Sequence, residues 1–168
     1  MKHKRKNIIN IVPLMHDINF DEFDCGNASV NRYTRNLYYQ EIMKLSSTKL
    51  IRCNNRIIGY YNINMCYIDA DEETYSGICI KFIGIISKCQ GKGIGTKTIK
   101  RIIVKSKEIS SFIGCRYIII NALKEKKQWY LDRGFEYIDE VQLDDNSPTI
   151  KMLMDFQDPE LINEYTNY

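Results

Sequence analysis

An apolar strand, a glycine-rich turn and a basic helix follow one another directly in the middle of the chain. Residues 78–86 are mostly apolar and rich in isoleucine, which predicts a short, buried central strand. Gly91, Gly93 and Gly95 come next, and residues 96–107 then carry isoleucines at helical spacing with basic side chains around the other face. This order indicates an α/β fold with the turn at the carboxyl end of a strand.

The remaining segments predict further strands of the same sheet and helices on its faces. Strands are expected over residues 8–12, 49–53, 56–65, 117–120 and 149–154, and helices over 27–39 and 124–133. Asn54 and Asn55 predict a hairpin turn, because asparagine tolerates a positive φ. Asn27 is expected to cap the first helix and Gly134 to end the last one. Residues 69–77 are expected to form a polar loop.

The length and composition indicate an ordinary globular protein. The chain has 168 residues, which predicts a single domain over residues 1–168, with a core over about 7–156 and a short C-terminal tail. No apolar run is long enough to span a bilayer, and no export signal precedes the fold, so we expect a cytoplasmic protein with no membrane partner. The six cysteines form no CxxC pair and are expected to be reduced thiols, with no metal site.

Positive charge is concentrated in two parts of the chain. The net charge is +3, and the first six residues alone contribute Lys2, Lys4, Arg5 and Lys6. Residues 81–107 contain eight lysines and arginines and no acid until Glu108. This local charge suits a compact, phosphate-rich ligand, although a solvated helix face would look the same. The charge pattern is not typical of a uniformly basic nucleic-acid binder, because the rest of the chain is close to neutral.

The glycine-rich turn predicts a phosphate site. The first turn of a helix has unpaired N–H groups and the positive end of the helix dipole, and glycine lets the backbone approach a ligand closely. The spacing matches neither of two common phosphate loops. A Walker loop needs Gly-Lys followed by Ser or Thr, and a dinucleotide-binding fold needs Gly-x-Gly-x-x-Gly.

Residues 90–95, read as Gln-Gly-Lys-Gly-Ile-Gly, resemble the Gln/Arg-x-x-Gly-x-Gly/Ala signature of the GNAT superfamily of N-acetyltransferases. The resemblance extends from Phe23 to about Phe156 and implies a GNAT-like, mostly antiparallel sheet flanked by helices. It also implies acetyl-CoA as co-substrate and no metal. The implied cofactor-binding residues are Ile83 and Ile85 for the pantetheine arm, Gln90, Gly91, Lys92, Gly93, Ile94, Gly95 and Thr96 for the pyrophosphate, and Asn121 for a pantetheine amide.

A second segment, Trp129–Phe135, is similar to the aromatic-Tyr-x-x-x-Gly-Phe segment of the same family and implies that Tyr130 is the general acid. A tyrosine hydroxyl can protonate or hydrogen-bond a departing thiolate at neutral pH. The alternative for Tyr130 is a core tyrosine, and for Asn121 a capping residue. The predicted strand 78–86 has no carboxylate, so the general base stays open between a water molecule and an acid from residues 69–73.

The third match, Phe23–Asn27, resembles the N-terminal signature of a GNAT subgroup that includes acetyltransferase toxins of toxin–antitoxin pairs. The predicted function is transfer of an acetyl group from acetyl-CoA to a primary amine of a small molecule or protein by direct transfer. Two alternatives stay open. One is a toxin that acetylates aminoacyl-tRNA, with tRNA and an antitoxin as partners. The other is a non-catalytic module that binds acetyl-CoA or RNA. The oligomeric state is open, and a homodimer is one option.

Overall fold

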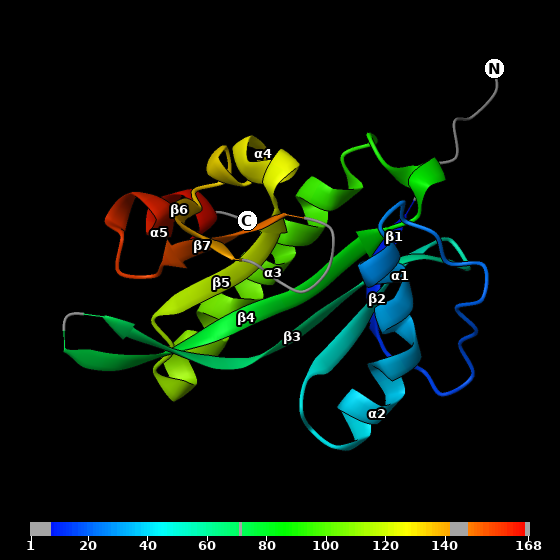
Figure 1. The fold of residues 1–168 in the computed structure, drawn as a ribbon, viewed down its shortest axis with the longest axis horizontal. Coiled ribbons are helices and arrows are strands. Elements are labelled where there is room, and N and C mark those ends of the chain that lie inside the picture. The colour runs from blue at the N-terminus through cyan, green and yellow to red at the C-terminus, as the bar shows by residue number, and fades with distance from the viewer. Residues whose placement is uncertain (1–7, 71, 142–147, 167–168) are drawn as a thin grey trace. The chain divides into compact units, whose positions relative to one another are not determined.

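The computed structural model describes residues 8–70, 72–141 and 148–166. The basic cluster Lys2–Lys6 lies outside the described residues, as do parts of two acidic stretches. In the described part of the chain, seven strands form one sheet in the order β1-β2-β3-β4-β5-β7-β6 (Figure 1). The strands are β1 Ile9–Pro13, β2 Ser47–Cys53, β3 Arg56–Ala70, β4 Glu73–Ile85, β5 Tyr117–Leu123, β6 Glu136–Val141 and β7 Thr149–Asp155.

The sheet is mixed, as the sequence predicts. Strand β4 runs parallel to β5, with Gly77–Ile80 opposite Tyr117–Ile120. The pairs β1–β2, β5–β7 and β6–β7 are antiparallel. The helices are α1 Ala28–Tyr33, α2 Leu37–Ile42, α3 Ile94–Ile113, α4 Lys127–Leu131 and α5 Pro159–Thr166. No helix of the described residues is both long and apolar enough to cross a membrane.

The described residues form two compact units. The first unit contains the chain up to Asn62 together with Phe82–Thr98, and the second contains Ile63–Lys81 and the chain from Ile99 onward. Strands β3 and β4 and helix α3 each contribute residues to both units. The prediction of a single domain stays a prediction.

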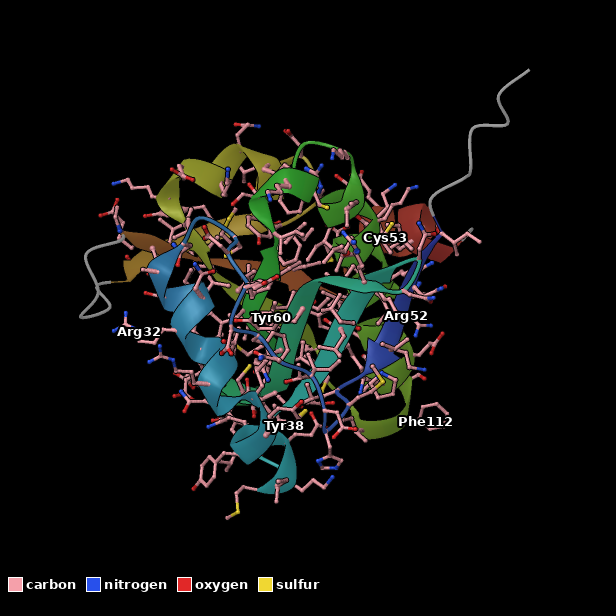
Figure 2. All side chains as sticks on the ribbon, turned by 90° about the vertical axis from the view of Figure 1, so that its right-hand side faces the viewer. Arg32, Tyr38, Arg52, Cys53, Tyr60 and Phe112 are labelled. Carbon is pink, nitrogen blue, oxygen red and sulfur yellow. The ribbon has the colours of Figure 1, made fainter. Side chains whose placement is uncertain are left out.

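The first unit has an aromatic and aliphatic core. Leu37, Leu50 and Tyr60 are fully buried, and Phe20, Phe23, Val30 and Phe82 are among the side chains packed against them. The Tyr60 ring, labelled in Figure 2, lies 5.4 Å from the ring of Phe23. Its hydroxyl donates to the carbonyl oxygen of Val30 at 2.7 Å, which ties α1 to β3. This core therefore fixes the segment before α1 against the strands.

The second unit is held together around the parallel strand pair. Tyr117, Ile119 and Leu153 are buried, with Cys66, Ile68 and Tyr75 packed against them. Arg116 lies over the rings of Tyr75 and Tyr117, at 4.6 and 4.9 Å from their centroids. Its guanidinium also pairs with the Asp155 carboxylate at 2.9 Å. Strands β4, β5 and β7 are thus joined by side chains as well as by the backbone ladder.

Most predicted elements are present, and the exceptions have local physical reasons. The expected helix 27–39 begins at the predicted cap, because the Asn27 side chain accepts from the Val30 N–H, but a 3-10 turn over residues 34–36 divides it into α1 and α2. The expected loop 69–77 is wrong. Strand β3 continues to Ala70 and β4 begins at Glu73, so most of these polar residues belong to a hairpin. Strand β6 and helix α5 were not predicted.

Candidate active site

The glycine turn adopts a backbone that favours glycine. Gly91 and Gly93 have φ values of +70° and +75°, in the left-handed region that other residues rarely adopt. A Cβ atom added at either position would have no neighbour within 4 Å. Space beside the loop is therefore open, and the glycines are required by backbone conformation and not by crowding from the protein itself. A ligand can approach this backbone closely.

Helix α3 begins immediately after the turn. The Lys97 N–H donates to the Gly93 carbonyl oxygen at 3.1 Å and closes the first helical turn. The first turn of a helix presents backbone N–H groups to its surroundings and carries the positive end of the helix dipole. The exposed Lys97 side chain adds a formal charge at the same place. The predicted phosphate loop over residues 90–96 thus leads directly into the start of a helix, and binding of an anion there stays a prediction.

Gln90 contacts the protein backbone. Its Nε2 atom donates to the carbonyl oxygens of Ile85 at 2.7 Å and Cys25 at 2.8 Å. An amide group has two N–H donors, so both are used. The neighbouring Lys92 ammonium also donates to the backbone, at the Lys88 carbonyl oxygen, 2.6 Å away. The geometry therefore gives Gln90 a supporting position beside the loop.

Two further predicted cofactor-binding residues, Ile83 and Ile85, lie at the end of β4, just before the turn. Ile83 is half-buried and Ile85 is buried. The Ile86 N–H donates to the Ile58 carbonyl oxygen at 2.9 Å, so β3 still holds the chain just before the turn. Ile83, Ile85 and the loop 90–96 all belong to the first unit.

Tyr130 belongs to the second unit and lies on α4. Its side chain is only 5% exposed, and its ring makes edge contacts with Trp129 and Phe135 at 4.8 and 5.5 Å between centroids. Burial raises the pKa of the Tyr130 hydroxyl well above its ordinary value, and the charge of Arg133 opposes this only in part. The phenol therefore stays protonated at every physiological pH. This packing agrees with the core-tyrosine alternative, while the role as acid stays a prediction.

The turn after Tyr130 is fixed by the glycine that the sequence singles out. Gly134 has φ +83°, and the Phe135 N–H returns to the Tyr130 carbonyl oxygen at 3.2 Å. Asn121 is exposed within β5, opposite Lys151 of β7. The strand continues to Leu123, so the alternative that Asn121 caps the following turn is wrong. Its contact with a pantetheine amide stays a prediction.

The chain matches a known domain family over most of its length. The profile of the acetyltransferase (GNAT) domain matches residues 22–156, which is most of the chain. The chain belongs to the GNAT acetyltransferase family. The match includes the glycine turn, Asn121 and Tyr130, and it confirms both the predicted family and the predicted class of enzyme. No curated protein matches the chain.

Solved structures show the same GNAT fold at low sequence identity. A mutant of the toxin AtaT bound to the C-terminus of the antitoxin AtaR is 19% identical, with a TM-score of 0.77 over 96% of this chain and 99% of that one. A structure described as a bacterial toxin is 14% identical, with a TM-score of 0.81 over 97% and 98%. AtaT complexed with acetyl-methionyl-tRNAfMet is 19% identical, with a TM-score of 0.76 over 93% and 99%.

The contacts between the segment before α1 and the turn before the glycine loop could not be predicted from the sequence. The Asp24 carbonyl oxygen accepts from the Ser87 N–H and from its hydroxyl, at 2.9 and 3.1 Å. In the sequence, the segment Phe23–Asn27 stands out only by its resemblance to a GNAT subgroup, and no pattern links it to Ser87. Within the described residues, no cluster of three or more histidine, cysteine or acidic side chains could hold a metal ion.

Proposed function

We propose that the chain is an N-acetyltransferase that transfers the acetyl group of acetyl-CoA directly to a primary amine. The observation that carries the proposal is the open, left-handed glycine turn at the start of α3, inside the family match over residues 22–156. A pyrophosphate needs several N–H donors and a positive environment, and both occur there. AtaTR bound with acetyl-CoA, which is 18% identical to this chain, supports the choice of co-substrate.

Each predicted residue has a defined role in this proposal. The backbone of Gly91–Thr96 binds the pyrophosphate. The backbone of Ile83 and Ile85 pairs with the pantetheine arm, and an N–H from the same strand end holds the thioester carbonyl oxygen. Asn121 hydrogen-bonds a pantetheine amide.

Tyr130 completes the reaction by donating a hydrogen bond to sulfur. The amine nitrogen forms a bond to the thioester carbon, the carbon–sulfur bond breaks, and the sulfur leaves with the electron pair. A free thiol has a pKa near 8.5, so complete proton transfer from a buried phenol is uphill. We therefore propose that Tyr130 stabilises the leaving thiolate by hydrogen bonding. The amine nitrogen loses its extra proton as the amide forms, and this proton neutralises the thiolate.

The class of acceptor amine can be narrowed because the part of β4 beside the turn contains no carboxylate that could serve as a base. Residues 75–85 of β4 contain no carboxylate, and the acids at Asp69 and Glu73 belong to the hairpin at the start of that strand. An α-amino group has a pKa near 8, against about 10.4 for a lysine side chain. At neutral pH a much larger fraction of an α-amino group is therefore neutral, and loss of its proton to water is easier than for a lysine side chain. The site thus suits an α-amine better than a lysine.

This preference supports a second candidate, the toxin-type reaction on aminoacyl-tRNA, whose acceptor is an α-amine. The neighbour AtaT in complex with acetyl-methionyl-tRNAfMet supports the same acceptor class. In this version tRNA and an antitoxin are the partners. A cytoplasmic location belongs to both versions, because acetyl-CoA and charged tRNA are found there. A homodimer stays a prediction.

The test is acetyl transfer by the purified protein. Thiol release from acetyl-CoA is measured with small amines, lysine peptides, amino acid esters and charged tRNAs. The proposal expects turnover with at least one α-amine, and turnover with charged tRNA alone would select the toxin version. Binding of acetyl-CoA without turnover on any acceptor would instead support the non-catalytic module.

A further inference from the structure

The segment Phe23–Asn27, called here the 23–27 segment, contacts both ends of the turn that leads into the glycine loop. A 3-10 turn over Ser87–Cys89 connects β4 to Gln90. The Asp24 carbonyl oxygen binds Ser87 at the start of this turn, and the Cys25 carbonyl oxygen binds Gln90 just after it. These contacts join residues more than 60 positions apart in the chain.

The 23–27 segment is itself fixed by its side chains. One Asp24 carboxylate oxygen accepts from the Gly26 N–H at 2.8 Å and from the Asn31 amide at 2.9 Å. Asn31 in turn accepts from the Cys25 N–H at 3.0 Å. The Gly26 and Asn31 bonds lower the pKa of the Asp24 carboxyl, which is therefore ionised at neutral pH. Gly26 has φ +81°, so the chain turns sharply at this point.

Close packing against β4 leaves the segment little room to shift. A Cβ atom added to Gly84 would lie 2.8 Å from Val30 Cγ1 and 3.1 Å from the Phe23 ring. It would also lie 3.5 Å from the Cys25 sulfur. The missing side chain at Gly84 thus lets the segment and the start of α1 sit directly on the strand.

We propose that the 23–27 segment and Gln90 together are positioning residues for the glycine loop. Gln90 uses both amide hydrogens on backbone carbonyls, so it holds the loop and does not donate to phosphate. Asp24 acts through its carbonyl oxygen on Ser87 and through its carboxylate on the conformation of Gly26. The loop is then preorganised, and the ligand does not have to order it on binding. This inference rests on the proposed function, since the loop is the expected acetyl-CoA site.

The experiment separates positioning from charge. In Asp24→Ala the carboxylate is lost, while Asp24→Asn keeps an oxygen that can accept the same two hydrogen bonds. Asp21→Ala is the matched control, because Asp21 is an exposed acid of the same loop whose bonds go to Asn19. Gln90→Met removes both donors at no change in charge. Removing an acid near a phosphate site would by itself strengthen binding of an anionic ligand.

We expect Asp24→Ala and Gln90→Met to raise the Kd and KM for acetyl-CoA about 10- to 100-fold. This is the usual cost of removing a group that positions a binding site. The kcat at saturating acetyl-CoA should change less than threefold, and Asp24→Asn and Asp21→Ala should bind like the unaltered protein. Unchanged affinity in Asp24→Ala and Gln90→Met would overturn the proposal. So would equal losses in Asp24→Asn and Asp24→Ala, which would show that the two hydrogen bonds accepted by the Asp24 side chain do not account for the loss.

A second readout does not depend on ligand. Amide hydrogen exchange in residues 91–95 should be faster in Asp24→Ala and Gln90→Met than in Asp21→Ala, with no acetyl-CoA present. Equal exchange rates would overturn the positioning role even if the proposed function is correct. If the unaltered protein binds no acetyl-CoA but the exchange rates differ as expected, the proposed function fails and the positioning of the loop stands.

Discussion

Substitutions at Gly93 test where the pyrophosphate binds, and two nearly isosteric residues separate charge from strain. Gly93 has a left-handed backbone with open space at the Cβ position, so neither Asn nor Asp would clash with the protein. Both residues tolerate this conformation better than other side chains do. Gly93→Asn and Gly93→Asp should therefore share the same backbone cost and the same added volume. They differ by one negative charge.

The size of the charge effect follows from Coulomb's law. For a carboxylate about 5 Å from a phosphate, an effective dielectric between 20 and 80 gives a repulsion of about 1–3 kcal/mol per charge pair. This corresponds to an increase of about fivefold to 150-fold in the Kd for CoA. We expect Gly93→Asp to bind CoA more weakly than Gly93→Asn by a factor in this range.

Calorimetric titration with CoA at low salt measures both affinities. The melting temperatures of the two variants without ligand should differ only by the effect of the Asp charge on the start of α3, about 0.3–1 kcal/mol in favour of Gly93→Asp. At high salt the difference in Kd should shrink, because screening weakens exposed charge pairs. Equal affinities of the two variants at low salt would refute the assignment of the loop to the pyrophosphate.

Three other outcomes can be measured on the same protein. Tyr130→Phe should lower kcat about 10²- to 10³-fold with little change in CoA affinity, because the leaving thiolate loses one hydrogen-bond donor. The kcat should show no loss from phenol ionisation below pH 10, because burial raises the pKa of Tyr130. The affinity for CoA should fall with rising salt if Lys97, Lys100 and Arg101 attract its phosphates. Asn27→Ala should remove the cap of α1, cost about 1 kcal/mol of stability, and lower the Tm by about 2–4 °C in a thermal melt.

Local signals made much of the fold predictable from sequence. Asn27 caps α1, Asn54 has the positive φ of 54° expected in the hairpin turn, and Gly134 ends the segment after Tyr130. Each of these positions depends on a residue with a distinctive backbone or side-chain preference. The glycine loop belongs to the same class, because φ values near +70° at alternate positions leave glycine as the natural choice.

Strand β6, helix α5 and the hairpin of β3 and β4 do not follow from such single-residue signals. Strand β6 exposes Tyr137 and Ile138, so its pattern does not show a buried face. Helix α5 does have a start signal, since Asp158 accepts from the Glu160 N–H and Pro159 occupies the first turn. Strands β3 and β4 extend through a polar stretch in which Thr74 donates to Asp69 at 2.7 Å across the hairpin. The polar composition alone predicts a loop, but hydrogen bonding across the hairpin stabilises paired strands there.

The support of the glycine loop could not be predicted for a different reason. The Asp24 and Cys25 groups that bind Ser87 and Gln90 are backbone carbonyls, which every residue has. The sequence therefore carries no side-chain pattern for these bonds, and only the fold brings the two segments together. What the sequence does contain is the means of fixing the segment: an acid at Asp24 and a glycine at Gly26.

The double hydrogen bond of Gln90 is compatible with a family signature that has either Gln or Arg at this position. The two residues differ in charge, so a direct phosphate contact would favour Arg strongly over the neutral amide. They share a planar end group with at least two N–H donors, which is what two backbone carbonyls require. The carbonyls of Ile85 and Cys25 are bound by such a group here. The proposed positioning role therefore depends on the number and planarity of the donors at Gln90, and in the proposed site the positive charge comes from the start of α3.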